Sequence, residues 1–151
     1  GAPRRIDATS FVGLFLSRRA IARGGYPDGR LFIYGDDVLY TLGLRKAGLS
    51  IGFVPGIRFE HDGGRPGQRR YPPGWKAYYG TRNGLFMYRA AAGPLFLPAM
   101  ALVLGQWLLA GRHYGPDRRA YYRLLWHGLR DGAAGRAAIP HSEVLRLARP
   151  R

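Results

Sequence analysis

The clearest feature of the hydrophobic pattern is a short apolar run that ends in two adjacent acidic residues. Residues 31–34 are Leu, Phe, Ile and Tyr, and one glycine separates them from Asp36 and Asp37. A run of this length and composition predicts a buried strand. Apolar residues then recur at helical spacing up to Gly48, which predicts a helix over residues 37–47. A strand that turns into a helix ends at the rim of a sheet, where open α/β folds bind ligands.

The acidic pair also has a purely structural interpretation. An aspartate at a helix start is a good cap and interacts favourably with the positive end of the helix dipole. Two adjacent carboxylates repel each other, and only one of them caps the helix. The second carboxylate of Asp36 and Asp37 therefore favours a functional site.

The alternating pattern continues after this helix and ends in a histidine. Residues 49–55 predict a second strand, and residues 57–61 predict a short extended piece that ends in His61. A lone histidine is usually a surface residue or one whose hydrogen bonds are satisfied. Here it follows Asp37 after one helix and one strand, an excursion that brings a chain back beside its start. An imidazole near carboxylates is typical of a divalent-metal site.

The remaining elements follow from helical spacing and from cap residues. Helices are expected over residues 18–23, 75–92, 118–130 and 140–149, with Ser17, Asp117 and Ser142 as N-caps of the first, third and fourth. Residues 63–74 are rich in Gly, Pro and Arg, including Arg65, Arg69 and Arg70. This stretch predicts a solvated basic loop, with closure over a pyrophosphate as the alternative.

Short motifs between residues 7 and 88 occur in a specific order. They are Gly24-Gly25-Tyr26-Pro27, the run from Leu31 to Tyr40, Lys46-Ala47-Gly48, Pro55, Phe59-Glu60-His61 and the stretch from Trp75 to Asn83. Together they resemble the C-terminal half of family 2 inverting glycosyltransferases. Within that family the resemblance is to bacterial galactofuranosyl- and rhamnosyltransferases that build cell-wall or surface polysaccharide. It implies an α/β fold, namely the C-terminal, acceptor-side half of a GT-A (nucleotide-diphospho-sugar transferase) fold.

The resemblance also implies roles for particular residues. Asp37 is the expected general base, Asp36 orients the acceptor, and His61 helps to coordinate Mn²⁺ or Mg²⁺. Substrate contacts are expected from Val12, Gly13, Tyr79 and Arg82. The alternatives stay open: Gly13 marks a bulge or a tight backbone approach, and Tyr79 and Arg82 belong to the sheet-facing stripe and the wet face of one helix.

Members of this family bind their nucleotide-sugar donor through an N-terminal half that ends in an Asp-x-Asp motif. No such motif precedes Asp36. We therefore expect this chain to be the acceptor-side half of an enzyme, which needs a missing N-terminal half to bind donor. The implied acceptor is a glycan carried on a polyprenyl diphosphate.

The charge balance points to anionic partners. Lys and Arg total 24 against 9 acidic residues, which gives a formal net charge of +15, and 46% of the residues are hydrophobic. This composition excludes a disordered basic tail. A basic nucleic-acid-binding module is the alternative class, but no zinc-ligand spacing, RNP-like motif or helix-turn-helix pattern occurs. We therefore expect no nucleic-acid partner.

Residues 90–111 contain no charged side chain. As a helix this stretch is comparable in length with a bilayer core, but Pro94 and Pro98 disfavour a plain spanning helix. A re-entrant or interfacial segment is expected, with Arg89 and Arg112 at anionic lipid headgroups. The alternatives are a buried helix of a larger assembly and a non-catalytic membrane-anchoring piece.

These observations divide the chain into three parts. Residues 1–88 are expected to form the acceptor-side half of the catalytic domain, residues 89–112 the membrane-associating segment, and residues 113–151 a basic helical tail. The predicted location is the cytoplasmic face of the cell membrane, as a peripheral or re-entrant protein.

Overall fold

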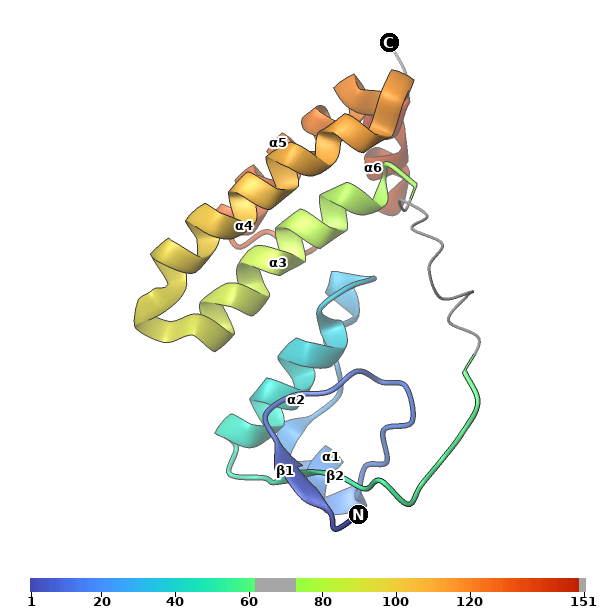
Figure 1. Cartoon of the computed structure of the whole chain (residues 1–151), viewed down its shortest axis with the longest axis vertical. Helices are drawn as coiled ribbons and strands as arrows, with labels where there is room; N and C mark the ends of the chain where they lie inside the picture. The colour runs from blue at the N-terminus through green and yellow to red at the C-terminus, as the bar shows by residue number, and fades with distance from the viewer. Residues whose placement is uncertain (62–72, 150–151) are drawn as a thin grey trace. The chain divides into compact units, whose positions relative to one another are not determined.

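The computed structural model describes residues 1–61 and 73–149 (Figure 1). The chain divides into two compact units. The first contains Gly1–Asp28 and Asp36–Arg69, and the second contains Gly29–Gly35 and Arg70–Arg151. This division differs from the predicted one, because residue 88 lies inside a helix of the second unit and residues 29–35 group with that unit as well.

The first unit combines two helices with a small sheet. Its elements are β1 (Arg4–Ile6), α1 (Arg18–Gly24), α2 (Asp36–Lys46) and β2 (Ile51–Phe53). The strands pair antiparallel, with Arg5 opposite Gly52. The strand predicted over residues 49–55 is thus confirmed at its centre, whereas residues 57–61 are exposed and form no regular element.

The helix boundaries of the first unit follow the predicted signals. The Ser17 hydroxyl accepts a hydrogen bond from the Ala20 N–H at 3.1 Å, which confirms this residue as the N-cap of α1. Gly48 has a φ of 79°, and the Leu49 N–H donates to the Leu44 carbonyl at 3.1 Å. A left-handed residue directly after a helix closes its last turn, so Gly48 is confirmed as the stop of α2.

The second unit is helical. Its helices are α3 (Lys76–Ala92), α4 (Phe96–Ala110), α5 (Arg118–Ala133) and α6 (His141–Ala148), with 3₁₀ turns at Gly29–Leu31, Gly93–Leu95 and Gly111–Asp117. Figure 1 shows α3 alongside α4, and α3 also packs along α5. The described chain is therefore mostly helical with one two-stranded antiparallel sheet, and the α/β fold of the GT-A type expected from the resemblance is not seen in the described residues.

Two further predicted caps have different outcomes: one stands at the start of its helix without a cap hydrogen bond, and the other is wrong. Asp117 directly precedes α5, but its side chain makes no cap hydrogen bond. Ser142 lies inside α6, which begins at His141 after Pro140. Proline is well suited to a helix start because its φ is already fixed near the helical value. The chain therefore begins α6 without a side-chain cap.

Two glycines let α5 approach α3 closely. A Cβ atom at Gly128 would lie 2.7 Å from the Tyr78 carbonyl oxygen, and one at Gly132 would lie 2.9 Å from the Arg82 carbonyl oxygen. These distances are shorter than van der Waals contact with backbone atoms that cannot easily move. The spacing of four residues places both glycines on one face of α5, so the backbones of α3 and α5 pack directly.

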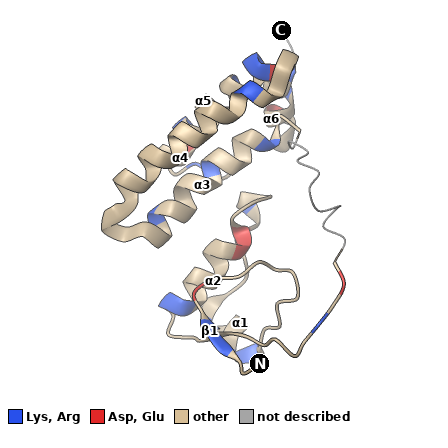
Figure 2. Ribbon diagram, viewed as in Figure 1, with Lys and Arg blue, Asp and Glu red and all other residues tan. Residues whose placement is uncertain are grey.

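α4 exposes apolar side chains along its length. Figure 2 shows this helix without charged residues, in contrast to its surroundings. Among the described residues, the helical run Lys76–Ala133 contains one stretch that is long and apolar enough to cross a membrane, and 6% of that stretch is buried within the chain.

Candidate functional site

The segment before the acidic pair has an unusual backbone. Phe32 and Tyr34 have φ values of 68° and 66°, and Gly35 has a φ of 81°. For a residue with a Cβ atom the left-handed region costs roughly 1–2 kcal/mol. Such strain persists only where the surrounding structure imposes it, and it clusters at functional sites. Because Phe32 and Tyr34 have left-handed rather than extended backbones, the strand expected over residues 31–34 is wrong.

The side chain of Asn83 on α3 replaces the missing strand partner. Its Nδ2 donates to the carbonyl oxygens of Leu31, Ile33 and Tyr34 at 3.0, 2.8 and 2.8 Å. Asn83 is fully buried, so these bonds are shielded from water. The carbonyl groups that a neighbouring strand would normally bond are thus satisfied by a side chain from a helix.

Arg82 adds to the same clamp. Its Nη2 donates to the Leu31 carbonyl at 2.9 Å and its Nε donates to Asn83 Oδ1 at 2.8 Å, which fixes the orientation of the amide. Arg82 is also fully buried, and its guanidinium lies over the ring of Tyr79. We call Arg82, Asn83 and the held residues 31–35 the loop clamp.

Gly35 ends the loop clamp at a position that favours glycine. A Cβ atom there would lie 2.8 Å from Met87 Sδ and 2.9 Å from its Cγ. Together with the positive φ, this contact favours glycine over any residue with a Cβ atom. The next residue in the chain is Asp36, the first of the acidic pair.

Asp36 and Asp37 form the first turn of α2, and both are half-buried. Asp37 Oδ1 accepts a hydrogen bond from the Val38 N–H at 2.7 Å. This bond satisfies one of the free N–H groups at the helix start. The structural interpretation of the pair, a carboxylate at the helix N-terminus, therefore applies to Asp37, and a catalytic role for it stays a prediction.

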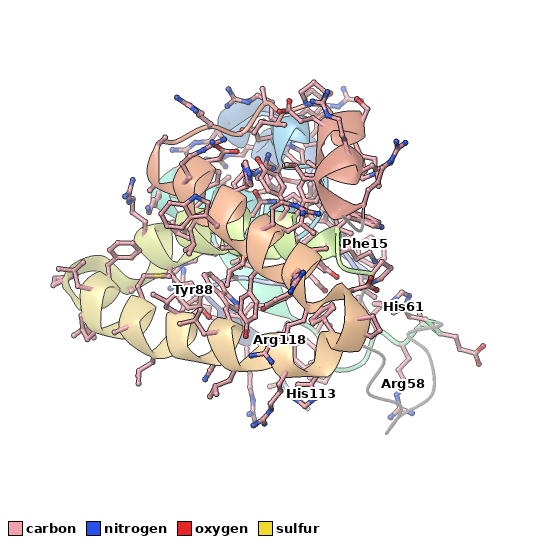
Figure 3. The ribbon with its side chains drawn as sticks, turned by 90° about the horizontal axis from the view of Figure 1, so that it is seen from above. Phe15, Arg58, His61, Tyr88, His113 and Arg118 are labelled. Carbon is pink, nitrogen blue, oxygen red and sulfur yellow. The ribbon has the colours of Figure 1, made fainter. Side chains whose placement is uncertain are left out.

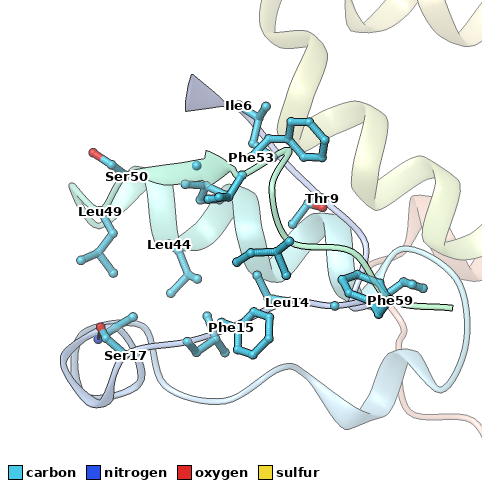
Figure 4. Close-up of a pocket in the computed structure, with 18 residues that line it drawn as sticks. Ile6, Thr9, Leu14, Phe15, Ser17, Leu44, Leu49, Ser50, Phe53 and Phe59 are labelled. Carbon is cyan, nitrogen blue, oxygen red and sulfur yellow. Dashed lines mark hydrogen bonds between the residues drawn. The ribbon is translucent and has the colours of Figure 1, made fainter. Parts of the chain in front are cut away.

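Val12 and Gly13 line a cavity of about 530 Å³ in the first unit (Figure 4). Its other walls come from residues after Thr9, from Leu44 of α2 and from residues around β2. A Cβ atom at Gly13 would overlap the ring of Phe59, and Gly13 has a φ of 68°. The alternative of a bulge or a tight backbone approach at Gly13 is not what the structure shows, because the close neighbour of Gly13 is the side chain of Phe59.

The segment that carries Val12 is fixed to α2. The Thr9 N–H donates to Thr41 Oγ1 at 3.2 Å, and Thr41 is fully buried. The rings of Phe11 and Tyr40 pack edge to face with centroids 6.0 Å apart. Asp36 and Asp37 are not among the described residues that line the cavity. A role of Val12 and Gly13 in acceptor binding stays a prediction.

Tyr79 and Arg82 lie in the interior of the second unit. The Tyr79 hydroxyl hydrogen-bonds with His141 Nδ1 at 3.0 Å, and burial raises the pKa of Tyr79 above its ordinary value. Arg82 donates its N–H groups to acceptors in the loop clamp and to the Ala137 carbonyl. Tyr79 is buried as the stripe alternative expected, but it packs against helix and loop residues rather than a sheet, and the wet face expected for Arg82 is wrong. Substrate contact by either residue stays a prediction.

His61 is exposed, near Arg58, in the stretch that precedes residue 62 (Figure 3). Within residues 1–61 and 73–149, no three His, Cys, Asp or Glu side chains come together in a way that could hold a metal ion. His61 by itself is not a metal site, because Mn²⁺ and Mg²⁺ need several oxygen or nitrogen ligands. Arg65, Arg69 and Arg70 lie outside the described residues.

Asn83 is the residue of this site for which the sequence analysis predicts no role. A signal for it was present, because asparagine is a poor helix former and here it occurs in a stretch of apolar and aromatic residues. A buried polar side chain in that position needs partners. The left-handed conformations of Phe32 and Tyr34 had no such signal, since neither residue type favours them.

Comparison with known proteins adds no assignment. No protein-family model, curated protein or solved structure matches this chain.

Proposed function

We propose that this chain is the acceptor-side half of an inverting glycosyltransferase of the GT-A type that works at a membrane. It transfers a sugar such as rhamnose or galactofuranose from a nucleotide-sugar to a cell-wall or surface polysaccharide acceptor carried on a polyprenyl diphosphate. The observation that carries the proposal is the loop clamp, whose strained residues end directly before Asp36 and Asp37. The order of sequence motifs from Gly24 to Asn83 supports the reaction class.

The loop clamp favours a functional site because its strained backbone costs conformational free energy. Two residues with Cβ atoms are held in the left-handed region, and two buried polar side chains are used to hold them. A chain that needed only a turn at this position would place glycine or asparagine there at a lower cost. The strain is therefore better explained by a requirement on the residues that follow.

The proposed chemistry uses the two carboxylates in different roles. Asp37 accepts the proton from the acceptor hydroxyl while that oxygen forms a bond with the anomeric carbon of the donor sugar. The bond between this carbon and the phosphate oxygen breaks on the opposite face, and the nucleoside diphosphate leaves. Asp36 accepts a hydrogen bond from the acceptor and orients it. A single displacement of this kind inverts the anomeric configuration.

Mn²⁺ or Mg²⁺ assists the leaving group in enzymes of the resembled family. The described residues do not supply a ligand set for such an ion, since His61 is exposed and stands apart from a cluster of other ligands. We therefore derive no step through a metal. His61 as one ligand, completed by an Asp-x-Asp motif of the donor-binding half, stays part of the proposal.

A second candidate is a non-catalytic membrane-anchoring piece. The exposed apolar surface of α4 favours it, because anchoring needs such a surface whether or not the acidic pair acts in catalysis. The two candidates differ in what they require of Asp37, which is essential for transfer and irrelevant for anchoring.

The test is the Asp37→Asn variant of the protein that carries this chain together with its donor-binding half. Asparagine keeps an oxygen that can accept the Val38 N–H bond, so the fold should survive, which circular dichroism checks. Loss of a general base lowers turnover by roughly 10²–10⁴-fold. Radiolabelled sugar transferred to a lipid-linked glycan measures turnover, and Asp28→Asn is the matched control. Turnover within a few-fold of the wild type would remove Asp37 from the role of base and leave capping as its function.

A further inference from the structure

One side of α4 is almost entirely apolar and exposed. Leu97, Leu102 and Leu109 have exposed fractions of 76%, 73% and 62%. The exposed residues of this side are Leu97, Pro98, Ala101, Leu102, Leu108 and Leu109, with Gln106 at its edge. A helix on a water-facing surface normally carries charged and polar residues there. A contiguous apolar surface of this kind marks a contact with another apolar phase.

The opposite side of α4 is already used for packing. Val103 is buried, and the Trp107 indole lies against Gly84 of α3, where a Cβ atom would be 2.9 Å from its Cζ2. The Tyr121 hydroxyl of α5 donates to the Trp107 carbonyl at 2.6 Å. α4 is therefore fixed in rotation, and its leucine-rich side faces away from the second unit.

Positive charges stand at both ends of α4. The Arg89 guanidinium lies 5.5 Å from the centroid of the Phe96 ring, at the first residue of the helix. Arg112 follows the last residue by two positions, and both arginines are exposed. The 15 residues of α4 extend for about 22 Å, which is shorter than the bilayer core of about 30 Å. A spanning orientation would pull one of these arginines into hydrocarbon, at a high cost.

We propose that α4 lies flat in the interface of an anionic lipid bilayer. Its leucine-rich side enters the upper acyl chains, and Arg89 and Arg112 contact lipid phosphates at its two ends. Both ends of the helix then stay on the same side of the membrane. The net charge of +15 complements an anionic surface, which a second copy of this equally basic chain does not offer. This inference holds whether or not the chain takes part in glycosyl transfer.

Vesicle co-sedimentation of the full chain tests the surface. We expect binding to phosphatidylcholine vesicles that contain phosphatidylglycerol, and weaker binding without it. The triple variant Leu97→Ser, Leu102→Ser, Leu109→Ser should bind on the order of a hundredfold more weakly, because three exposed leucines lose their insertion. The matched control is Tyr26→Ser, Ile57→Ser, Leu145→Ser, which changes three exposed apolar residues elsewhere and should bind as the wild type does.

The charges are tested separately. Arg89→Gln and Arg112→Gln should each weaken binding to anionic vesicles by about fivefold and leave binding to neutral vesicles nearly unchanged. Arg58→Gln, an exposed arginine of the first unit, is the control. Equal effects of all three variants would mean that the total charge of the chain, rather than the two arginines at the ends of α4, governs binding. This result would overturn the proposal.

Depth measurements test the orientation. The chain has no cysteine, so single cysteines at positions 97, 102 and 109 can carry an environment-sensitive dye. Quenching by lipids labelled at different depths should place all three dyes at the same shallow depth. A steady change of depth from position 97 to position 109 would show a tilted insertion and overturn the flat orientation. Failure to bind vesicles, with a dimer in light scattering that the leucine triple variant dissociates, would assign the surface to a second copy.

Discussion

Replacement of Asn83 by alanine should disturb the second unit more than its small loss of volume suggests. The change removes an amide whose two N–H groups serve three carbonyl oxygens. It also leaves the buried Arg82 Nε without its acceptor. A lost hydrogen bond costs about 1 kcal/mol, and a buried polar group left without a partner costs about 1–3 kcal/mol. Relaxation of Phe32 and Tyr34 out of the left-handed region returns about 1–2 kcal/mol for each residue.

The balance of these contributions is a loss of about 2–4 kcal/mol in the free energy of unfolding. Urea titration followed by tryptophan fluorescence is the assay, because Trp75, Trp107 and Trp126 all lie in the second unit. Gln106→Ala removes an exposed amide from α4 and serves as the control. Its effect should stay within about 0.5 kcal/mol.

Hydrogen exchange distinguishes a local effect from a general one. In Asn83→Ala the amides of residues 32–35 should exchange faster than in the wild type under conditions where the amides of α5 do not change. A loss below about 0.5 kcal/mol, or unchanged exchange in residues 32–35, would refute the reasoning that Asn83 imposes this conformation.

Three further predictions follow from the second unit. Because the left-handed φ of Tyr34 penalises any Cβ atom, Tyr34→Gly should be more stable than Tyr34→Ala by about 1 kcal/mol in urea unfolding, and the reverse order would contradict the strain. Gly132→Ala should cost about 1–3 kcal/mol, since its Cβ meets the Arg82 backbone, whereas Gly105→Ala on α4 should be tolerated. Burial, with Tyr114 and Tyr122 nearby, raises the pKa of Tyr121 to about 12. The protonated Tyr121 hydroxyl therefore makes its full contribution to the free energy of unfolding below pH about 10, and this contribution is lost as the pH rises through 12. Tyr121→Phe should lower stability at pH 8 through its lost bond to Trp107, yet lose less stability than the wild type between pH 8 and pH 11.

Local signals in the sequence were sufficient for most helices. Ser17, Gly48 and the helical spacing of apolar residues act within a few positions, so α1 and α2 were found close to their observed bounds. The cap predicted at Ser142 failed because residue type alone does not decide where a helix starts, whereas Asp117 does stand at the start of α5 but makes no cap hydrogen bond. Pro140 already has a φ suited to begin α6.

The backbone conformation of the segment before Asp36 could not be predicted from neighbouring residues in the sequence. Its apolar and aromatic residues favour a strand, and in a sheet they would have formed one. Asn83, 52 positions later, takes the Leu31 carbonyl instead, and the backbone follows that bond into the left-handed region. The partners of Tyr79 and Arg82 are long-range as well, which is why the sequence suggested an exposed position for Arg82 although it is buried.

The exposed side of α4 likewise depends on long-range packing. The lack of charge between residues 90 and 111 was visible in the sequence, but an uncharged helix suits a protein core and a membrane equally. Only the packing of Trp107 and Val103 on one side shows which residues are left outside. The membrane surface proposed for α4 therefore depends on the fold rather than on composition.

The most direct test of the proposed function is the anomeric configuration of the product. The protein that carries this chain with its donor-binding half is incubated with nucleotide-activated rhamnose or galactofuranose and a lipid-linked glycan. The new glycosidic bond is then examined by NMR, and released nucleoside diphosphate is counted for each sugar transferred. A single displacement with Asp37 as base predicts complete inversion and one diphosphate for each bond formed. Retention of configuration, or release of diphosphate without a new bond to the glycan, would contradict it.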